Sequence, residues 1–240
     1  MGDQACILYG AAVFSRDIDI AVAADARNLV RLRAALNDLR AEPVFFPPLS
    51  AVALRRGHAC HFRCRAPGLR DVRPDVMATM RSAAPFGALW RRRVVLDLPG
   101  DVRVALMSVE DLVRIKKTQR DKDWPMVRRL VETDIHACRT PSSDKVRFWL
   151  RECRTAQLLC SLVKKHRALA RREAAARGLL LAALSGDERA VEAGLQAEEA
   201  LERELDRVYW RPLRAELETM RLQRPRRSSH RRTGRRRGTR

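Results

Sequence analysis

Two aspartates, Asp17 and Asp19, are separated by one β-branched residue and precede the apolar segment 20–22. Side chains of a strand alternate between its two faces, so both carboxylates would point the same way. Like charges side by side repel unless a cation lies between them. Mg²⁺ prefers oxygen ligands of this kind and often shares them with substrate phosphates. The spacing indicates metal-assisted phosphoryl or nucleotidyl transfer, and a solvated aspartate pair at a strand entrance is the alternative.

A third acid, Asp75, follows Pro74 at the start of an expected strand over residues 73–78. If that strand lies beside the one that carries Asp17 and Asp19, three carboxylates can bind two Mg²⁺ ions. One ion would hold the nucleotide phosphates, and the other would lower the pKa of an attacking hydroxyl. Taken alone, Asp75 is equally well explained as an ordinary strand-end residue after a proline.

Three segments offer groups that could hold phosphate. Backbone N–H groups around Gly2 could form a turn at the start of a helix. Ser15 and Arg16 come directly before the aspartate pair, where an exposed turn is nearly as good an explanation. Lys116 belongs to a charged segment, 116–124, which could neutralise a triphosphate or form a solvated corner between helices.

Zinc and serine-hydrolase chemistry are not expected. His58, Cys60 and Cys64 would share one face of a strand, while His61 would face the other way. No second cysteine pair has matching spacing, as a zinc site would need. No Gly-x-Ser-x-Gly motif is present. The six cysteines of this chain are expected to be reduced thiols rather than a disulfide framework.

The composition favours polyanionic partners. The net charge is +20, and residues 223–240 contain nine arginines and no acid. Such a surface attracts phosphate over a long range and releases counterions when it binds. No run of about 18 apolar residues exists, so no membrane span is expected. The N-terminal residues lack a secretory signal pattern, which favours the cytoplasm.

The pattern of elements predicts an α+β (α/β-like) fold, with a small mixed sheet and flanking helices. Alternating or continuous apolar runs predict the strands: 17–22, 44–46, 58–65, 73–78, 94–98 and 102–107. Helical spacing and capping residues predict the helices: 4–13, 26–40, 108–118 and 123–132. Residues 140–143 form the expected boundary between a domain over 1–139 and three or four further helices over 140–222. Residues 223–240 are expected to be a disordered basic tail.

The chain resembles a minimal nucleotidyltransferase of the DNA polymerase beta superfamily, of the AbiEii-type bacterial branch. Residues 2–10 with 14–19 match the glycine turn, helix and Asp-x-Asp strand of that family. Residues 73–77 match the segment with its third acid. Residues 107–130 match a lysine-bearing helix before a charged turn. The resemblance covers about residues 1–135.

This resemblance implies a two-ion Mg²⁺ site and a nucleoside triphosphate substrate. Asp17 and Asp19 would bridge the metals, and Asp75 would bind the catalytic metal and help to activate the acceptor hydroxyl. The acceptor would be RNA, a protein side chain or a small molecule, and the basic C-terminal half makes RNA attractive.

The same resemblance assigns the triphosphate to Gly2, Ser15, Arg16 and Lys116. The family turn is usually Gly-Gly or Gly-Ser, after a strand and a helix. Here the second position is Asp3, and only one residue precedes Gly2. We therefore expect a domain that lacks its first helix and strand, with an open edge beside the strand of Asp17.

Two other function classes remain open at this stage. One is a catalytically degenerate nucleotidyltransferase fold that acts as a nucleic-acid-binding or toxin–antitoxin component, with an antitoxin protein as its partner. The other is a docking role for the helices of residues 144–222, through oligomerisation or a partner protein.

Overall fold

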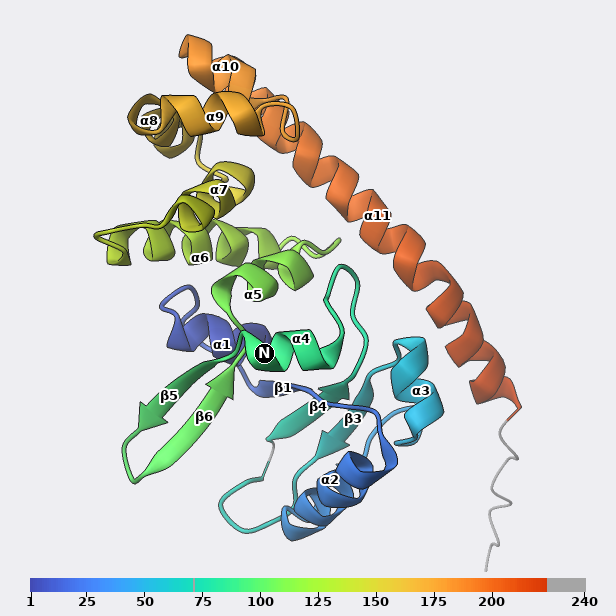
Figure 1. Ribbon diagram of the computed structural model, residues 1–240. Coiled ribbons are helices and arrows are strands. Elements are labelled where there is room, and N and C mark those ends of the chain that lie inside the picture. Colours follow the sequence, from blue (N-terminus) through green and yellow to red (C-terminus); the bar gives the residue numbers. More distant parts are fainter. Residues whose placement is uncertain (71, 224–240) are drawn as a thin grey trace, which may run out of the picture.

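The computed structural model describes residues 1–70 and 72–223 (Figure 1). It combines a small mixed sheet, a separate β-hairpin and many helices, so the predicted mixture of α and β elements is confirmed. The predicted tail over residues 223–240 lies, from residue 224 onward, outside the described residues. None of the described helices combines the length and the apolar character that a membrane crossing needs.

The main sheet has four strands in the order β1-β4-β3-β2. These are β1 (Asp17–Ala21), β4 (Arg73–Met77), β3 (Cys60–Arg63) and β2 (Glu42–Pro43). β1 and β4 are parallel, whereas the other neighbouring pairs are antiparallel. β1 therefore lies at one edge of this sheet, as the sequence predicted.

The strand predicted over residues 44–46 is wrong. β2 ends at Pro43, and only the N–H of Val44 continues the ladder, by donating to the carbonyl of His61 at 2.9 Å. Proline has no N–H to donate, and two more prolines follow at positions 47 and 48. The proline-rich segment therefore leaves the sheet after two paired residues.

One face of the sheet is apolar. Phe62 and Val76 belong to a buried cluster with residues of α2 (Ala26–Asp38) and α3 (Ala51–Arg56). The side chain of Asp25 caps α2 by accepting a hydrogen bond from the N–H of Asn28 at 2.9 Å. Because side chains alternate along each strand, the charged residues between these apolar positions face the other side.

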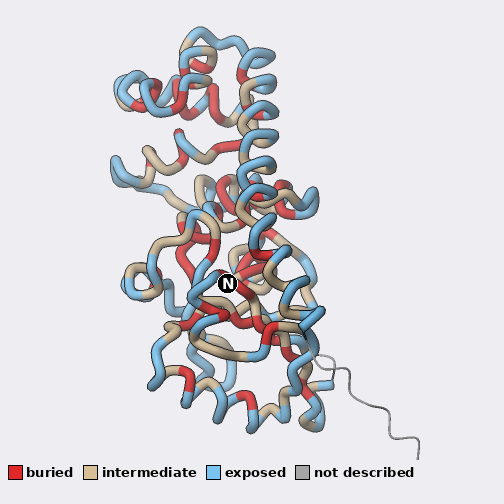
Figure 2. Tube along the Cα trace, turned by 90° about the vertical axis from the view of Figure 1, so that its right-hand side faces the viewer, coloured by how far each residue is buried: buried red, intermediate tan, exposed pale blue. Residues whose placement is uncertain are grey.

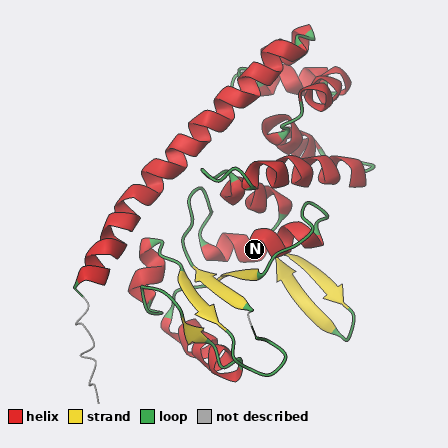
Figure 3. Cartoon of the chain, turned by 180° about the vertical axis from the view of Figure 1, so that it is seen from behind, coloured by secondary structure: helices red, strands yellow, loops and turns green. Residues whose placement is uncertain are grey.

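On the open side of β1 lie α1 (Gly2–Leu8), α4 (Phe86–Arg91) and the hairpin of β5 (Val94–Leu98) and β6 (Val102–Leu106) (Figures 1 and 3). The hairpin confirms the sequence prediction. The helix predicted over residues 4–13 instead begins at Gly2 and ends at Leu8. Gly10 follows with φ of 75°, a left-handed conformation that ends the helix.

Two helices connect this part to the C-terminal region. α5 (Val109–Lys116) is capped by Ser108, whose hydroxyl accepts from the N–H of Asp111 at 3.2 Å, as predicted. α6 (Asp123–Ala137) extends five residues beyond its predicted end at residue 132. Ile135 lies beyond the predicted end and packs, partly buried, against the main apolar cluster, so packing continues along this helix.

The C-terminal region contains five described helices rather than three or four: α7 (Ser143–Glu152), α8 (Ala156–Lys165), α9 (Arg167–Glu173), α10 (Leu180–Ser185) and α11 (Glu188–Leu222). α11 has 35 residues and runs back along the molecule to α3 (Figures 1 and 3). Its length is the largest departure from the expected organisation.

α11 is joined to the N-terminal part by ion pairs and by a hydrogen bond. Arg81 contacts Glu202 at 2.8 Å and Asp206 at 3.3 Å, and buried His58 lies 3.0 Å from Glu216. One apolar cluster also continues from α1 through α5 and α6 to α11, across the proposed boundary at 140–143. Figure 2 shows buried segments in both halves of the chain. The described residues therefore share one continuous core across that boundary.

Candidate functional site

The candidate site is the polar face of β1 and β4. The parallel register pairs Asp19 with Asp75 and Asp17 with Arg73. Paired positions of neighbouring strands project to the same face, so the three carboxylates share one face of the sheet. The expectation that the two strands are neighbours is confirmed. Asp75 is the central residue of β4 rather than its first.

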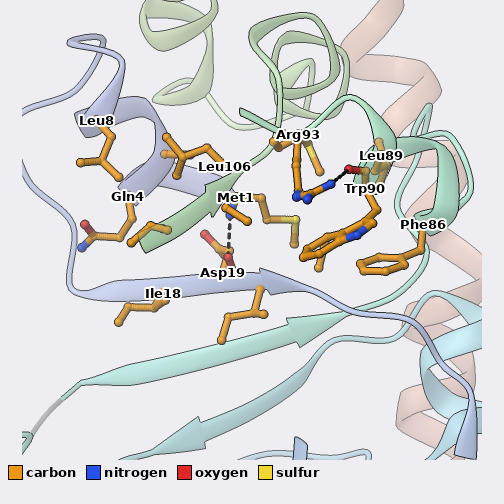
Figure 4. A pocket seen from close by; sticks show the side chains of 16 residues that line it. Met1, Gln4, Leu8, Ile18, Asp19, Phe86, Leu89, Trp90, Arg93 and Leu106 are labelled. Carbon is orange, nitrogen blue, oxygen red and sulfur yellow. Dashed lines mark hydrogen bonds between the residues drawn. The ribbon is translucent and has the colours of Figure 1, made fainter. Parts of the chain in front are cut away.

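Asp19 has a pKa that its surroundings shift. Burial raises its pKa above the ordinary value, and the nearby charge of Asp75 raises it further, against a smaller opposing effect of Lys116. The terminal amine of Met1 donates to the backbone carbonyl of Asp19 at 2.8 Å (Figure 4). A carboxylate pair with this electrostatic strain is the type of site that a cation stabilises.

Asp17 and Asp75 each have a basic neighbour. Arg73 Nη2 lies 2.5 Å from Asp17 Oδ1, and His61 Nδ1 lies 2.8 Å from Asp75 Oδ1. Asp17 Oδ1 is buried but accepts no hydrogen bond, so the contact with Arg73 lacks hydrogen-bond geometry. Oxygen ligands of this type fit Mg²⁺. Within the described residues, no three His, Cys, Asp or Glu side chains are arranged as a ready metal cluster. Metal binding would therefore require the Arg73 and His61 side chains to move.

Gly2 lies directly against Asp19. Its φ is 68°, and a Cβ added to it would lie 1.7 Å from Asp19 Oδ2. Only glycine fits this approach, which places the first turn of α1 over the carboxylate. The sequence assigned Gly2 to phosphate binding, and in the structure its nearest functional neighbour is a carboxylate.

Replacement of Gly2 by alanine is expected to displace the Asp19 side chain and to destabilise the protein by about 1–3 kcal/mol, because of the left-handed φ and the clash. Urea unfolding of Gly2→Ala and of Gly100→Ala measures this. Gly100 has φ of 81° but open space at its Cβ position, so it isolates the effect of the φ angle. Equal losses in both variants would show that the contact with Asp19 is unimportant.

A cavity of about 290 Å³ adjoins Asp19 (Figure 4). It lies between the free edge of β1, α1, α4 and β6. Phe86 and Trp90 stack at 5.9 Å between ring centroids, and the Arg93 guanidinium lies 4.1 Å from the Trp90 ring centroid. The other polar side chain at this cavity is Gln4. An apolar, aromatic wall with few polar groups beside a perturbed carboxylate is typical of a small-molecule site.

The sequence prediction missed the aromatic wall of this cavity. Phe86 and Trp90 are four residues apart, which places them on one face of a helix. That spacing was the available signal. Their position next to Asp19 depends on how α4 packs against β1, which their spacing does not determine.

Lys116 lies inside an ion-pair cluster. It is 3% exposed, and its Nζ contacts the carboxylates of Asp3 and of Asp123, the latter at 3.1 Å. Burial alone would lower the pKa of Lys116, but Asp123 and Asp3 outweigh burial and raise it. Lys122 also contacts Asp3, at 3.0 Å. The cation that the sequence assigned to a triphosphate is thus already paired with two acids.

Ser15 and Arg16 lie at the beginning of β1, apart from this cluster. The Ser15 hydroxyl donates to the Asp17 carbonyl at 3.0 Å and accepts from the Asp17 N–H at 3.2 Å. Arg16 is exposed and packs over the ring of Phe14 at 5.8 Å. Among the described residues, no hydrogen bond or ion pair joins Ser15 or Arg16 to Gly2 or Lys116, the other residues predicted to hold triphosphate.

Comparison with known proteins adds no family assignment. No protein-family model matches the chain, and no curated protein sequence matches it.

Proposed function

We propose that this protein is a Mg²⁺-dependent nucleotidyltransferase, which moves a nucleoside monophosphate from a nucleoside triphosphate to an acceptor hydroxyl. The observation that carries the proposal is the in-register pair of Asp19 and Asp75, with Asp17 on the same face, beside an aromatic cavity. The resemblance of residues 1–135 to minimal nucleotidyltransferases supports the same chemistry.

The three carboxylates have different roles in this proposal. Asp17 and Asp19 would hold Mg²⁺ near the phosphates, and Asp75 would take up the proton of the acceptor hydroxyl. The acceptor oxygen then bonds to the α-phosphorus, and the bond from that phosphorus to the bridging oxygen breaks, which releases pyrophosphate. Bound Mg²⁺ supplies the positive charge that stabilises the phosphate oxygens in the transition state.

The cavity beside Asp19 is our candidate for the nucleoside. Bases stack on aromatic side chains, and Trp90, which is 48% exposed, would offer its ring once the Arg93 side chain moves from above it. Arg93 and Gln4 offer hydrogen bonds at the rim. Because Asp19 is part of the same wall, a nucleoside in this cavity would have its phosphates near the carboxylates.

The test is transfer of label from α-³²P nucleoside triphosphates to RNA or to protein. Wild type is expected to label an acceptor with Mg²⁺, and Asp75→Asn to be about 10²–10⁴-fold slower because a positioned base is lost. Asp97→Asn is the control, since Asp97 is an exposed carboxylate on the hairpin. Equal rates for wild type and Asp75→Asn with a genuine acceptor would contradict the proposal.

A second candidate function is nucleic-acid binding without catalysis. One observation favours it: Asp3 neutralises Lys116, which leaves this cation without free charge for a triphosphate. This alternative expects polyanion binding that persists in Asp19→Asn and that weakens steeply with salt. The labelling experiment separates the two candidates, because only the enzyme forms a covalent product.

A further inference from the structure

A second pocket, of about 580 Å³, opens at the beginning of β1 and β4. Four arginines from three separate segments line it: Arg16, Arg63, Arg70 and Arg73. The remaining lining residues are neutral: Gln4, Ser15, Ile18 and Val72. We call this the arginine pocket. Four guanidinium groups at one concave surface repel each other unless an anion lies among them.

Most of this positive charge is uncompensated within the described residues. Arg73 pairs with Asp17, but no carboxylate of those residues lies within ion-pair distance of Arg16, Arg63 or Arg70. Arg63 Nε is also buried and has no hydrogen-bond partner among them. A buried N–H donor without an acceptor is costly, and a phosphate oxygen would satisfy it.

The arginine pocket is continuous with the carboxylate face. Arg63 follows His61 by two positions in β3, and Arg73 precedes Asp75 by two positions in β4. Because His61 and Asp75 are paired, both arginines point to the same face of the sheet as this pair. The contact of Arg73 with Asp17 joins the pocket to the carboxylates. An anion held here lies at the beginning of β1, whereas the aromatic cavity lies along the free edge of that strand.

We infer that the arginine pocket binds backbone phosphates of single-stranded nucleic acid, the acceptor whose terminal hydroxyl reaches the carboxylates. The role of this nucleic acid as acceptor rests on the proposed function, but its binding to the arginine pocket does not. Among the described residues, three arginines of this pocket lack a carboxylate partner. Three such cations are more than one phosphate needs, whereas a nucleic-acid strand presents a series of phosphates. The net charge of +20 favours the same class of ligand. Arginine suits it because its planar fork binds phosphate with two donors.

Binding of a fluorescein-labelled single-stranded RNA of about ten nucleotides tests this, with the full chain and without Mg²⁺ or nucleotide. Arg63→Gln and Arg70→Gln are each expected to weaken binding about 3–10-fold and to reduce the salt slope by about 0.7. Arg103→Gln is the matched control, because Arg103 is 75% exposed on the hairpin and pairs with Asp97. Equal weakening by all three variants would overturn the inference, since it would indicate general attraction.

Chemical footprinting locates the bound RNA and distinguishes binding at the arginine pocket from binding at the basic C-terminal residues. RNA is expected to protect Arg16 and Arg70, which are both exposed, from phenylglyoxal, as read by peptide mass spectrometry. Unprotected Arg16 and Arg70 would overturn the inference. Displacement of RNA by MgATP would also overturn it, because the pocket would then hold the triphosphate. Protection without any nucleotide transfer would support the pocket and contradict the proposed enzyme.

Discussion

Asp19→Asn is expected to abolish nucleotide transfer and the stabilisation by Mg²⁺, while the metal-free protein becomes more stable at pH 7. Burial and the neighbouring Asp75 raise the pKa of Asp19, so the fold disfavours its charged form. Asparagine has a similar shape and removes that charge. A loss of function together with a gain of stability is the signature of a strained ligand rather than of a structural residue.

The pH dependence follows from the sign of this shift. A carboxyl group with a raised pKa in the folded state favours folding below its unfolded pKa. That contribution is lost as pH rises through the folded pKa. The stability difference between Asp19→Asn and wild type is therefore expected to be largest near neutral pH and to shrink as pH falls. Thermal unfolding of both proteins between pH 4 and 7.5, in chelator, measures it.

The metal dependence gives a second readout that does not need an acceptor. Mg²⁺ at ten times its Kd adds about 1.4 kcal/mol to the stability of a protein that binds it only when folded. For a chain of this size that raises Tm by about 3–6 °C. Wild type and Asp97→Asn are expected to show the rise, and Asp19→Asn is not. An equal rise in all three would place the metal elsewhere.

The strands of the site could be predicted from local sequence. Apolar alternation located β1 and β4, and the shared need of Asp17 and Asp75 for a cation suggested that these strands are neighbours. Strand patterns carry this information because one face of each strand is buried and the other is not. The length and direction of α11 could not be predicted in this way, since they depend on ion pairs such as that between Arg81 and Glu202.

The surroundings of the carboxylates were less predictable. The contact of Gly2 with Asp19 joins residues on different elements, and the contact of His61 with Asp75 depends on the register of β3. Such contacts follow from tertiary packing rather than from propensity. The arginine pocket is a similar case, because Arg16 and Arg63 come together only when the sheet forms.

Lys116→Met is expected to be the most destabilising replacement, by about 3–5 kcal/mol, because it removes the buried cation that two carboxylates share and leaves them only the more exposed Lys122 and Arg120. Asp123 is fully buried, and Asp3 shares the same ammonium group. Lys122→Met is the matched control. Lys122 also contacts Asp3, but its side chain is 57% exposed, so its loss is expected to change stability by less than about 1 kcal/mol. Urea unfolding at pH 7 measures both.

Urea unfolding of the same proteins at acidic pH tests whether the role of Lys116 is structural. Burial opposes ionisation of Asp3, but Lys116 and then Lys122 outweigh it and hold the pKa of Asp3 below its ordinary value. A depressed pKa stabilises the fold above the unfolded pKa, and this stabilisation is lost as pH falls through the folded pKa. Lys116→Met removes most of it, so stability of this variant is expected to fall less than that of wild type on acidification. Parallel pH profiles for the two proteins would mean that Asp3 does not depend on Lys116, which would return this lysine to the triphosphate role that the sequence suggested.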